Sequence, residues 1–230
     1  MRTVGLIGGM SWVSTAEYYR LMNEAVAQRC GGLHSASLVV ASVDFAEIEA
    51  LKLAGNWDAV AAELSDAGRR LECAGADAII LCTNTMHYVA APIESAVTVP
   101  FLHIADATAQ RVTASGITRV GLLATAFTMQ ESFYVDRFRS FGIDVVLPDI
   151  DDRGAVSRII YDELCHNVVR EESRTLFRSV VERLAADRAE GVILGCTEVE
   201  LLIRPGDVDV AVFPTTRIHV DAAVDFALSP

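Results

Sequence analysis

The sequence carries the same strand pattern twice. Val4-Gly5-Leu6-Ile7 resembles Val120-Gly121-Leu122-Leu123, and the run 79–83 resembles the run 192–197. Short apolar runs rich in Val and Ile, separated by longer amphipathic stretches, are typical of buried parallel strands joined by helices. We therefore predict an α/β protein made of two related halves.

Eight apolar runs are predicted strands, four in each half. They are residues 3–7, 37–43, 78–81, 101–104, 119–123, 144–147, 192–194 and 210–213. We expect two pseudo-symmetric domains, each a four-stranded parallel sheet flanked by helices, with the active site in the cleft between them. The predicted first domain consists of residues 1–100 plus 208–230 and carries Cys82. The predicted second domain consists of residues 101–207 and carries Cys196.

Two helix starts can be predicted from capping residues. Ser14-Thr15-Ala16-Glu17 has the pattern of a capping box, and Gly31 is the predicted end of the helix that follows. Asn56 is the predicted cap of a second helix, which ends at Gly75.

Charge and hydropathy exclude several classes of partner. The formal net charge is -12, from 19 basic and 31 acidic residues, and no run of Lys or Arg occurs. Nucleic acids and anionic membranes require a basic surface, so neither is expected as a partner. No apolar run reaches the roughly 18 residues of a membrane span, and the glycine-containing start is too short for a signal peptide. We expect a cytoplasmic protein, in which one pocket can still bind a small anion.

The cysteines form neither a disulfide pattern nor a zinc pattern. Their number is odd and no C-x-x-C spacing occurs, which argues against zinc ribbons and thioredoxin motifs. The histidines show no H-E-x-x-H spacing, so a metal site is not expected. Lys52 is the only lysine, which disfavours pyridoxal chemistry, because that cofactor is held on a lysine. The cysteines are Cys30, Cys73, Cys82, Cys165 and Cys196.

Two of the cysteines share one context. Cys82 and Cys196 each follow an apolar strand and precede Thr and then Asn or Glu, so each is predicted at a strand end and a helix start. Ligands bind at this edge of parallel α/β sheets, and a helix N-terminus lowers a thiol pKa and can hold a carboxylate. Cys30, Cys73 and Cys165 lack this context and are interpreted as small buried apolar residues.

A pair of equivalent thiols suits the inversion of a stereocentre. Racemisation removes a proton from one face of a carbon and returns a proton to the other face, through a flat carbanion. Two similar acid/bases on opposite sides are therefore needed, and a duplicated fold can supply them. N–H groups at both helix starts would stabilise the developing enolate charge.

The glycine-rich start and His87 each allow two interpretations. Residues 5–11 match neither G-x-G-x-x-G nor a Walker loop, and form either a turn that offers N–H groups to a carboxylate or a plain strand–helix turn. His87 follows Cys82 by five residues and serves either packing and capping or catalysis. The remaining histidines are interpreted as structural: His34, His103, His166 and His219.

Four motifs resemble the aspartate/glutamate racemase family. They are GLIGGM at 5–10, LCTNTMH at 81–87, GLLAT at 121–125 and GCTE at 195–198, and the resemblance extends over nearly the whole chain. The segments 9–12, 31–35, 42–45 and 101–106 resemble a bacterial subgroup that includes broad-specificity amino-acid racemases.

This resemblance implies a cofactor-independent amino-acid racemase, commonly a dimer of two-domain subunits. It implies that Cys82 and Cys196 are the catalytic acid/bases, with Cys196 acting on the L face of the substrate and Cys82 on the D face. The resemblance also places the substrate carboxylate near Asn84, Thr85 and Thr197. The full set of predicted substrate-binding residues is Met10, Ser11, Lys52, Asn84, Thr85, Thr125, Thr128, Thr197 and Glu198.

Departures from the family bear on the substrate. Cys165 stands in a segment where aspartate racemases can carry a lysine, and an arginine expected near 50–58 has no match except the nearby cation Lys52. A second substrate carboxylate needs a cation or a cluster of donors, so neutral amino acids join aspartate and glutamate as candidate substrates. The Asp that glutamate racemases carry before the glycine turn is absent from residues 5–7.

Other functions remain open at the level of sequence. Maleate isomerases, hydantoin racemases and a malonate decarboxylase resemble this frame, although a decarboxylase needs a proton donor on one face only. A non-enzymatic protein that binds a small carboxylate would use both cysteines as core residues. A redox thiol protein would bring the two sulfurs within bonding distance.

Overall fold

The chain forms two compact α/β units, each around its own parallel sheet. The structure is a computed structural model that describes residues 1–166 and 168–229. The first unit comprises Met1–Ile104 and His219–Pro230, and the second comprises Ala105–Ile218. The predicted α/β class with two parallel sheets is confirmed. The segment 208–218, which the predicted boundary gave to the first domain, lies in the second unit, and 101–104 lies in the first.

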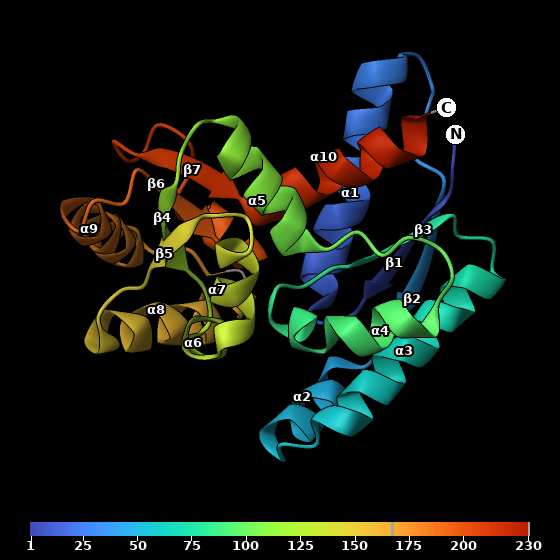
Figure 1. Cartoon of the computed structure of the whole chain (residues 1–230), viewed down its shortest axis with the longest axis horizontal. Helices are drawn as coiled ribbons and strands as arrows, with labels where there is room; N and C mark the ends of the chain where they lie inside the picture. The colour runs from blue at the N-terminus through green and yellow to red at the C-terminus, as the bar shows by residue number, and fades with distance from the viewer. Residues whose placement is uncertain (167, 230) are drawn as a thin grey trace. The chain divides into compact units, whose positions relative to one another are not determined.

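The first sheet has three strands in the order β2-β1-β3 (Figure 1). The strands are β1 (Val4–Gly8), β2 (Leu38–Ser42) and β3 (Ala78–Leu81). The expected fourth strand at 101–104 is not formed. Phe101 makes a single parallel bridge to Ile79, and a helix begins at Ile104, so the apolar run divides between a bridge and a helix.

Alternation along the strands gives the first sheet two apolar faces. One face packs against α3 (Trp57–Cys73), and the other packs against α1 (Trp12–Cys30) and the part of α10 (Thr215–Leu228) that belongs to this unit. The strand residues on the α3 face are Ile7, Ile79 and Leu81. Those on the opposite face are Val4, Leu6 and Ile80, and Cys82 continues this face one residue beyond β3.

The helices of the first unit follow its strands in turn. They are α1 (Trp12–Cys30), α2 (Phe45–Leu53), α3 (Trp57–Cys73), the 3₁₀ helix η1 (Thr85–Val89) and α4 (Ala90–Ala96). The predicted cap Asn56 is confirmed, because its side chain accepts the N–H of Ala59. The predicted capping box at 14–17 is wrong: helix α1 begins earlier, and Ser11 is its cap. Gly31 ends α1 as predicted, and Ala74 rather than Gly75 caps α3.

The second sheet repeats the first and adds a full fourth strand. Its order is β5-β4-β6-β7, so β4, β5 and β6 correspond to β1, β2 and β3, and β7 takes the place of Phe101 (Figure 1). The strands are β4 (Arg119–Leu123), β5 (Asp144–Val146), β6 (Gly191–Leu194) and β7 (Ala211–Pro214). The pairing of β7 with β6 is the reason that 208–218 belongs to this unit.

Helices surround the second sheet, with α9 packed against β4 and α7 against β5. The elements are α5 (Ile104–Ala114), α6 (Ala126–Gln130), α7 (Ser132–Arg139), α8 (Ile150–Asp162), η2 (Leu164–His166), α9 (Glu171–Ala186), η3 (Thr197–Leu201) and α10 (Thr215–Leu228). Helices α5 and α10 each run from one unit into the other.

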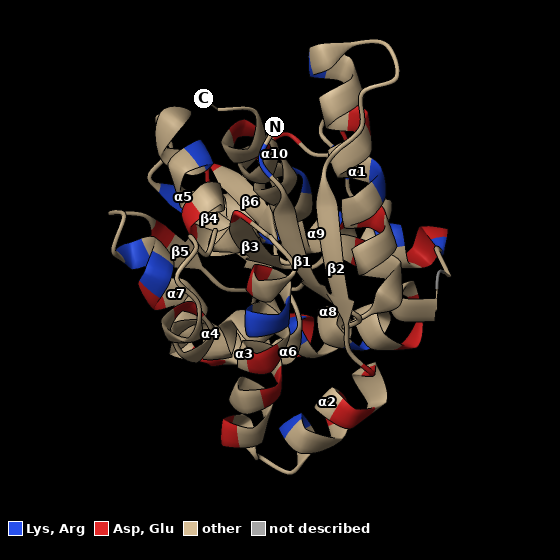
Figure 2. Ribbon diagram, turned by 90° about the vertical axis from the view of Figure 1, so that its right-hand side faces the viewer, with Lys and Arg blue, Asp and Glu red and all other residues tan. Residues whose placement is uncertain are grey.

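Charged side chains lie mainly on the helices and loops, where Lys and Arg alternate with Asp and Glu (Figure 2). The strands of the first sheet carry no charged residue, as expected for the buried strands β1 and β3, whereas β2 lies at the sheet edge and is partly exposed. Among the described residues, no helix combines the length and the apolar character that a membrane crossing requires.

Candidate functional site

Cys82 lies at the carboxyl end of β3 and is almost fully buried. Its N–H donates to the carbonyl of Ile7 at 2.9 Å, which extends the pairing of β3 with β1 by one residue. The side chain is 1% exposed and belongs to the apolar cluster formed with α1 and α10. Burial raises the pKa of the Cys82 thiol far above its usual value, because a thiolate loses its hydration there.

The loop after Cys82 is held by His87. The ring Nδ1 of His87 lies 2.7 Å from the carbonyl of Thr83, and Nε2 accepts the N–H of Ile104 at 3.3 Å. Because Nε2 is an acceptor, the proton of the neutral ring is on Nδ1, which donates to Thr83. His87 therefore fixes the segment that contains two predicted substrate-binding residues, the buried Asn84 and the partly exposed Thr85.

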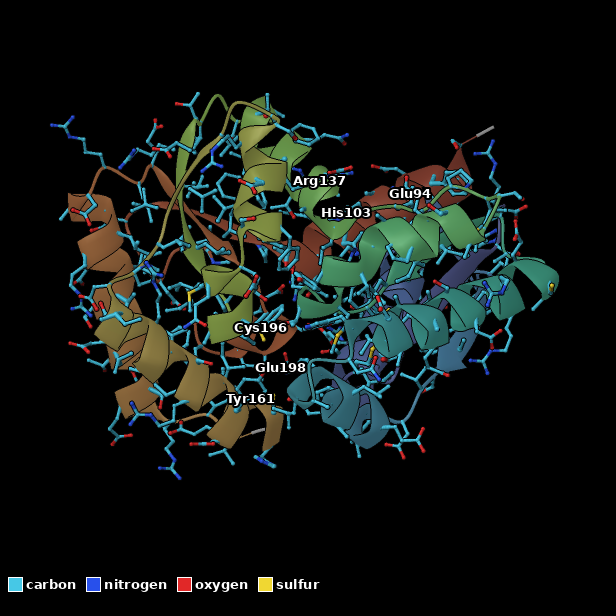
Figure 3. The ribbon with its side chains drawn as sticks, turned by 60° about the horizontal axis from the view of Figure 1, so that its bottom comes forward. Glu94, His103, Arg137, Tyr161, Cys196 and Glu198 are labelled. Carbon is cyan, nitrogen blue, oxygen red and sulfur yellow. The ribbon has the colours of Figure 1, made fainter. Side chains whose placement is uncertain are left out.

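Cys196 lies two residues beyond β6 and has a polar partner. Its Sγ donates to Oε2 of Glu198 at 3.1 Å (Figure 3). Cys196 is partly exposed, whereas Glu198 is 7% exposed. Burial raises the pKa of the Cys196 thiol well above its usual value, and the Glu198 carboxylate raises that pKa further by opposing a second negative charge.

Gly195 brings Cys196 close to the neighbouring strand. The N–H of Gly195 donates to the carbonyl of Leu123 at 2.7 Å. A Cβ at this position would lie 3.0 Å from the side chains of Ala124 and Leu122. The glycine thus allows the cysteine loop to pack against the end of β4.

The expected lowering of the thiol pKa by a helix N-terminus is wrong for both cysteines. The elements that follow them, η1 and η3, are 3₁₀ helices of five residues each. A helix dipole develops over several turns, and burial outweighs the effect of such short segments. Both thiol pKa values are raised instead.

Two predicted binding residues in the second unit bond to each other. Thr125 caps α6, with its Oγ1 3.4 Å from the N–H of Thr128 and 3.1 Å from the Thr128 hydroxyl. Both threonines are buried. Thr197 follows Cys196 directly and is partly exposed.

The predicted binding residues at the glycine-rich start have structural contacts. Met10 is 5% exposed and lies in the apolar cluster on the α3 face. Ser11 caps α1 and accepts the N–H of Ser14 at 3.4 Å. Lys52 lies on α2, and its Nζ is 2.7 Å from a carboxylate oxygen of Glu49, so the charge of this cation is shared with an acidic neighbour.

Two backbone groups of the glycine-rich turn form hydrogen bonds within the first unit. The N–H of Gly9 donates to Oγ1 of Thr15 at 2.8 Å, and the carbonyl of Gly8 accepts the N–H of Val43 at 3.0 Å. Gly9 has φ +98°, and a Cβ there would lie 2.2 Å from the carbonyl oxygen of Val43. These contacts support the interpretation of a plain strand–helix turn.

Three cysteines differ from the expected buried apolar residues. Cys30 and Cys73 are exposed at the last positions of α1 and α3, and Cys165 is partly exposed on η2. Cys165 also interacts electrostatically with Cys196, and η2 packs against η3. This approach could not be predicted from the sequence, because Cys165 and Cys196 lie on elements that are far apart in the chain.

A buried histidine contact in the first unit was also not predictable from the sequence. His219 Nε2 donates to the carbonyl of Leu102 at 2.7 Å, and Nδ1 lies 2.9 Å from the hydroxyl of Tyr18. His219 and Tyr18 are fully buried, and burial lowers the pKa of His219 to about 4. The residue is therefore a neutral structural group, as interpreted from the sequence.

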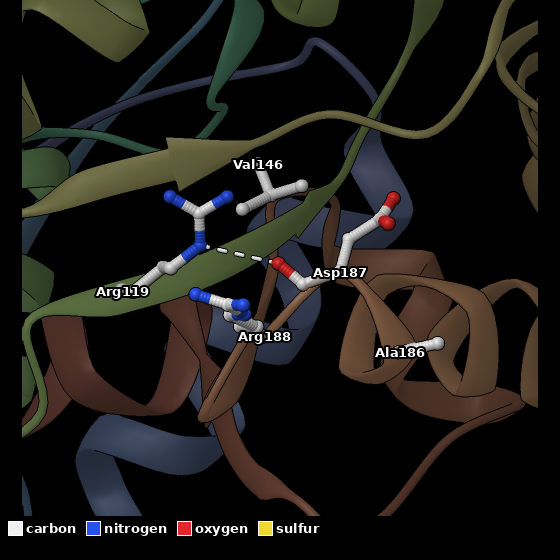
Figure 4. A pocket seen from close by; sticks show the side chains of 5 residues that line it. All are labelled: Arg119, Val146, Ala186, Asp187 and Arg188. Carbon is white, nitrogen blue, oxygen red and sulfur yellow. Dashed lines mark hydrogen bonds between the residues drawn. The ribbon is translucent and has the colours of Figure 1, made fainter.

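Among residues 1–166 and 168–229, no group of three or more His, Cys, Asp and Glu side chains could hold a metal ion. A hollow of about 460 Å³ lies in the second unit, between the start of β4 and the loop before β6 (Figure 4). It is lined by Arg119, Val146, Ala186, Asp187 and Arg188. Neither cysteine is among the residues that line it.

The fold and these residues define a duplicated α/β protein with one cysteine at the same topological position in each unit. The family model for Asp/Glu/hydantoin racemase matches residues 7–223. The chain belongs to this family.

Solved structures agree with the family. A proposed Asp/Glu racemase from Yersinia pestis is 50% identical, with all of both chains covered and a TM-score of 0.95. An aspartate racemase homologue from Pyrococcus horikoshii is 32% identical, again over all of both chains, with a TM-score of 0.90. An aspartate racemase from Picrophilus torridus shares the fold at 22% identity, over 99% of this chain and 94% of the other, with a TM-score of 0.77.

Proposed function

We propose that the protein is a cofactor-independent amino-acid racemase in which Cys82 and Cys196 act as the two acid/bases. The observation that carries this proposal is the equivalent position of the two cysteines, one residue beyond β3 for Cys82 and two residues beyond β6 for Cys196, each the third strand of its unit. Membership of the racemase family supports the reaction type. The equivalence supplies what inversion requires, a proton acceptor and a proton donor of the same kind.

One thiol and one thiolate complete the reaction in each direction. The thiolate takes the α-proton, and the electron pair of the broken C–H bond passes into the adjacent carboxylate as an enolate. The thiol then gives its proton to the opposite face of the carbon, and its S–H electron pair stays on sulfur as the new thiolate. The enzyme ends each turnover with its proton on the other sulfur, ready for the reverse direction.

Burial of the two cysteines makes their thiolates stronger bases. An α-proton of an amino acid is a far weaker acid than a free thiol, so a thiolate with a raised pKa is a stronger base for it. The same burial lowers the fraction of thiolate. Donors near the substrate carboxylate must offset this, and Asn84, Thr85 and Thr197 are the residues we assign to that role.

Aspartate and glutamate are the first substrates to test, together with neutral amino acids. A substrate with a second carboxylate needs a cation or a cluster of donors, and the only lysine, Lys52, already contacts Glu49. A neutral side chain makes no such demand. The substrate panel should therefore include both enantiomers of acidic and of neutral amino acids.

The proposal is tested by chiral chromatography of this panel without added pyridoxal phosphate. We expect racemisation by the wild type, with exchange of the α-hydrogen for solvent deuterium, and a loss of at least about 1000-fold in Cys82→Ala and in Cys196→Ala. Cys30→Ala and Cys73→Ala are matched controls at exposed thiols and should keep full activity.

Three results would contradict the proposal. Wild-type activity in either Cys82→Ala or Cys196→Ala would remove the two-base mechanism. Absence of deuterium exchange from every amino acid, with turnover of maleate or a hydantoin, would assign the protein to another activity of the family. Carboxylate binding without any turnover would indicate a binding protein.

A further inference from the structure

The two cysteine loops differ at one chemically important position. Cys82-Thr83-Asn84 in the first unit corresponds to Cys196-Thr197-Glu198 in the second. Asn84 and Glu198 are both buried, at 4% and 7% exposure. The first loop therefore places a neutral amide two residues after its cysteine, and the second places a carboxylate there.

The carboxylate is bonded to the thiol directly. Oε2 of Glu198 lies 3.1 Å from Sγ of Cys196, within the range of a hydrogen bond to sulfur. An ionised carboxylate can only accept, so the thiol must be the donor and must carry its proton. Loss of that proton would place two negative charges at this distance in a site with little water.

We propose that Glu198 is a positioning residue that holds the proton on Cys196 in the resting protein. This inference rests on the proposed racemase function for its consequence, the choice of which thiol acts first as base. In the direction that uses Cys196 as the acid, Cys196 then already carries the proton that it must donate. In the opposite direction, Cys196 must first lose the proton that Glu198 holds.

Few other groups compete with Glu198 for this role. The Glu198 carboxylate raises the pKa of the Cys196 thiol, the backbone N–H of Glu198 lowers it, and Cys165 raises it less than the carboxylate does. Arg174 of α9 donates to the carbonyl of Leu202, beyond η3. Cys82 differs because burial alone raises its pKa.

Glu200 offers a matched control on the same 3₁₀ helix. Its Oε2 lies 3.4 Å from Arg217 of α10, and its side chain is 16% exposed. Replacement of Glu200 by Gln removes the same charge from η3. It leaves the hydrogen bond of Cys196 in place.

The test is the pH dependence of alkylation by iodoacetamide, which is neutral and reacts with the thiolate. Peptide mass spectrometry follows Cys196 in the wild type, Glu198→Gln, Glu198→Asp and Glu200→Gln without substrate. In Glu198→Gln we expect the midpoint for Cys196 to fall by about one pH unit or more, with about tenfold faster alkylation at pH 8. Glu200→Gln should match the wild type, and Glu198→Asp, which keeps the charge, should lie close to it.

Exposed thiols in the same digests serve as internal standards. Cys30 and Cys73 should react at the same rate in every variant. An unchanged or higher midpoint for Cys196 in Glu198→Gln would overturn the proposal, as would an equal fall in Glu200→Gln. If Glu198→Gln does not fold, a midpoint in Glu198→Asp far from the wild type would overturn it as well.

Racemisation in both directions then tests the consequence. In Glu198→Gln the high-pH limb of the rate should move to lower pH in the direction that uses Cys196 as the acid, because the thiol loses its proton sooner. The reverse direction should keep its high-pH limb. A shift in alkylation together with no racemisation by the wild type would retain the role of Glu198 as proton holder and reject the proposed function. Racemisation by the wild type with no shift in alkylation would retain the proposed function and reject the role of Glu198.

Discussion

The two units share one strand order but treat their cysteines differently. Cys82 is 1% exposed in an apolar cluster, and burial alone raises the pKa of its thiol. Cys196 is partly exposed and donates to a carboxylate, Glu198. The duplicated backbone thus gives the two cysteines equivalent positions but different surroundings, apolar for Cys82 and partly polar for Cys196.

The turns after the first strands of the two units differ as well. In the first unit, Gly9 approaches the backbone of Val43 so closely that no side chain fits. In the second unit the corresponding turn contains Ala124 and Thr125, and it has no glycine. Each turn ends at the hydroxyl residue that caps the next helix, Ser11 in the first unit and Thr125 in the second.

The largest effect is expected from Gly9→Ala, which tests whether the turn of the first unit requires glycine. Alanine would combine strain at φ +98° with an overlap against the Val43 carbonyl, and we expect a loss of about 3 kcal/mol or more. Gly31→Ala is the matched control, since Gly31 also has a positive φ, +75°, but has open space around it. It should cost about 1 kcal/mol.

Denaturant unfolding at neutral pH measures both changes. Equal costs for Gly9→Ala and Gly31→Ala would show that the conformation alone, and not the close approach to Val43, demands glycine. The close approach to Val43 would then not distinguish the turn of the first unit from the glycine-free turn of the second.

A second prediction concerns acid sensitivity, which we assign to the first unit. Burial lowers the pKa of His219 from 6.5 to about 4, so between these values the unfolded chain binds a proton that the folded protein does not. The stability contributed by neutral His219 is complete above about pH 6.5 and is lost as the pH falls towards 4. From pH 7 to pH 5 this amounts to about 2 kcal/mol.

His219→Phe removes the titrating group and measures this contribution. At pH 7 the variant should be less stable by about 2 kcal/mol, because the hydroxyl of Tyr18 and the carbonyl of Leu102 lose a partner. At pH 5 the difference between wild type and variant should shrink towards zero. A difference that stays constant from pH 7 to pH 5, in unfolding curves, would mean that His219 does not titrate in this range.

Much of the fold could be predicted from periodicity. The predicted runs 78–81 and 119–123 coincide with β3 and β4, because buried parallel strands are short and almost wholly apolar. The run 101–104 is equally apolar and was predicted as a strand, yet it divides between a bridge and the first turn of α5. Apolar composition cannot separate these cases, since a buried helix start and a buried strand carry the same residues.

The site could be predicted in its positions but not in its contacts. The repeated Cys-Thr context located Cys82 and Cys196 at strand ends, which the structure places directly after β3 and two residues after β6. The hydrogen bond from the Cys196 thiol to the Glu198 carboxylate joins residues two apart at the start of η3, and no sequence rule predicts a side-chain contact at that spacing. Tyr18 and His219 meet across 201 residues, and only the folded chain brings them together.

The smallest expected effects come from the two caps, and they test whether the hydroxyls serve the fold or the substrate. Thr125 is buried and bonds both the N–H and the hydroxyl of Thr128, whereas Ser11, which accepts the N–H of Ser14, is partly exposed. We expect Thr125→Ala to cost about 1–2 kcal/mol and Ser11→Ala about 0.5–1 kcal/mol, with Thr125→Ser close to wild type. Thermal unfolding of the three variants gives the order. If instead Ser11→Ala reduced turnover severalfold with no loss of stability, Ser11 would contact the substrate, and the caps of the two units would have different roles.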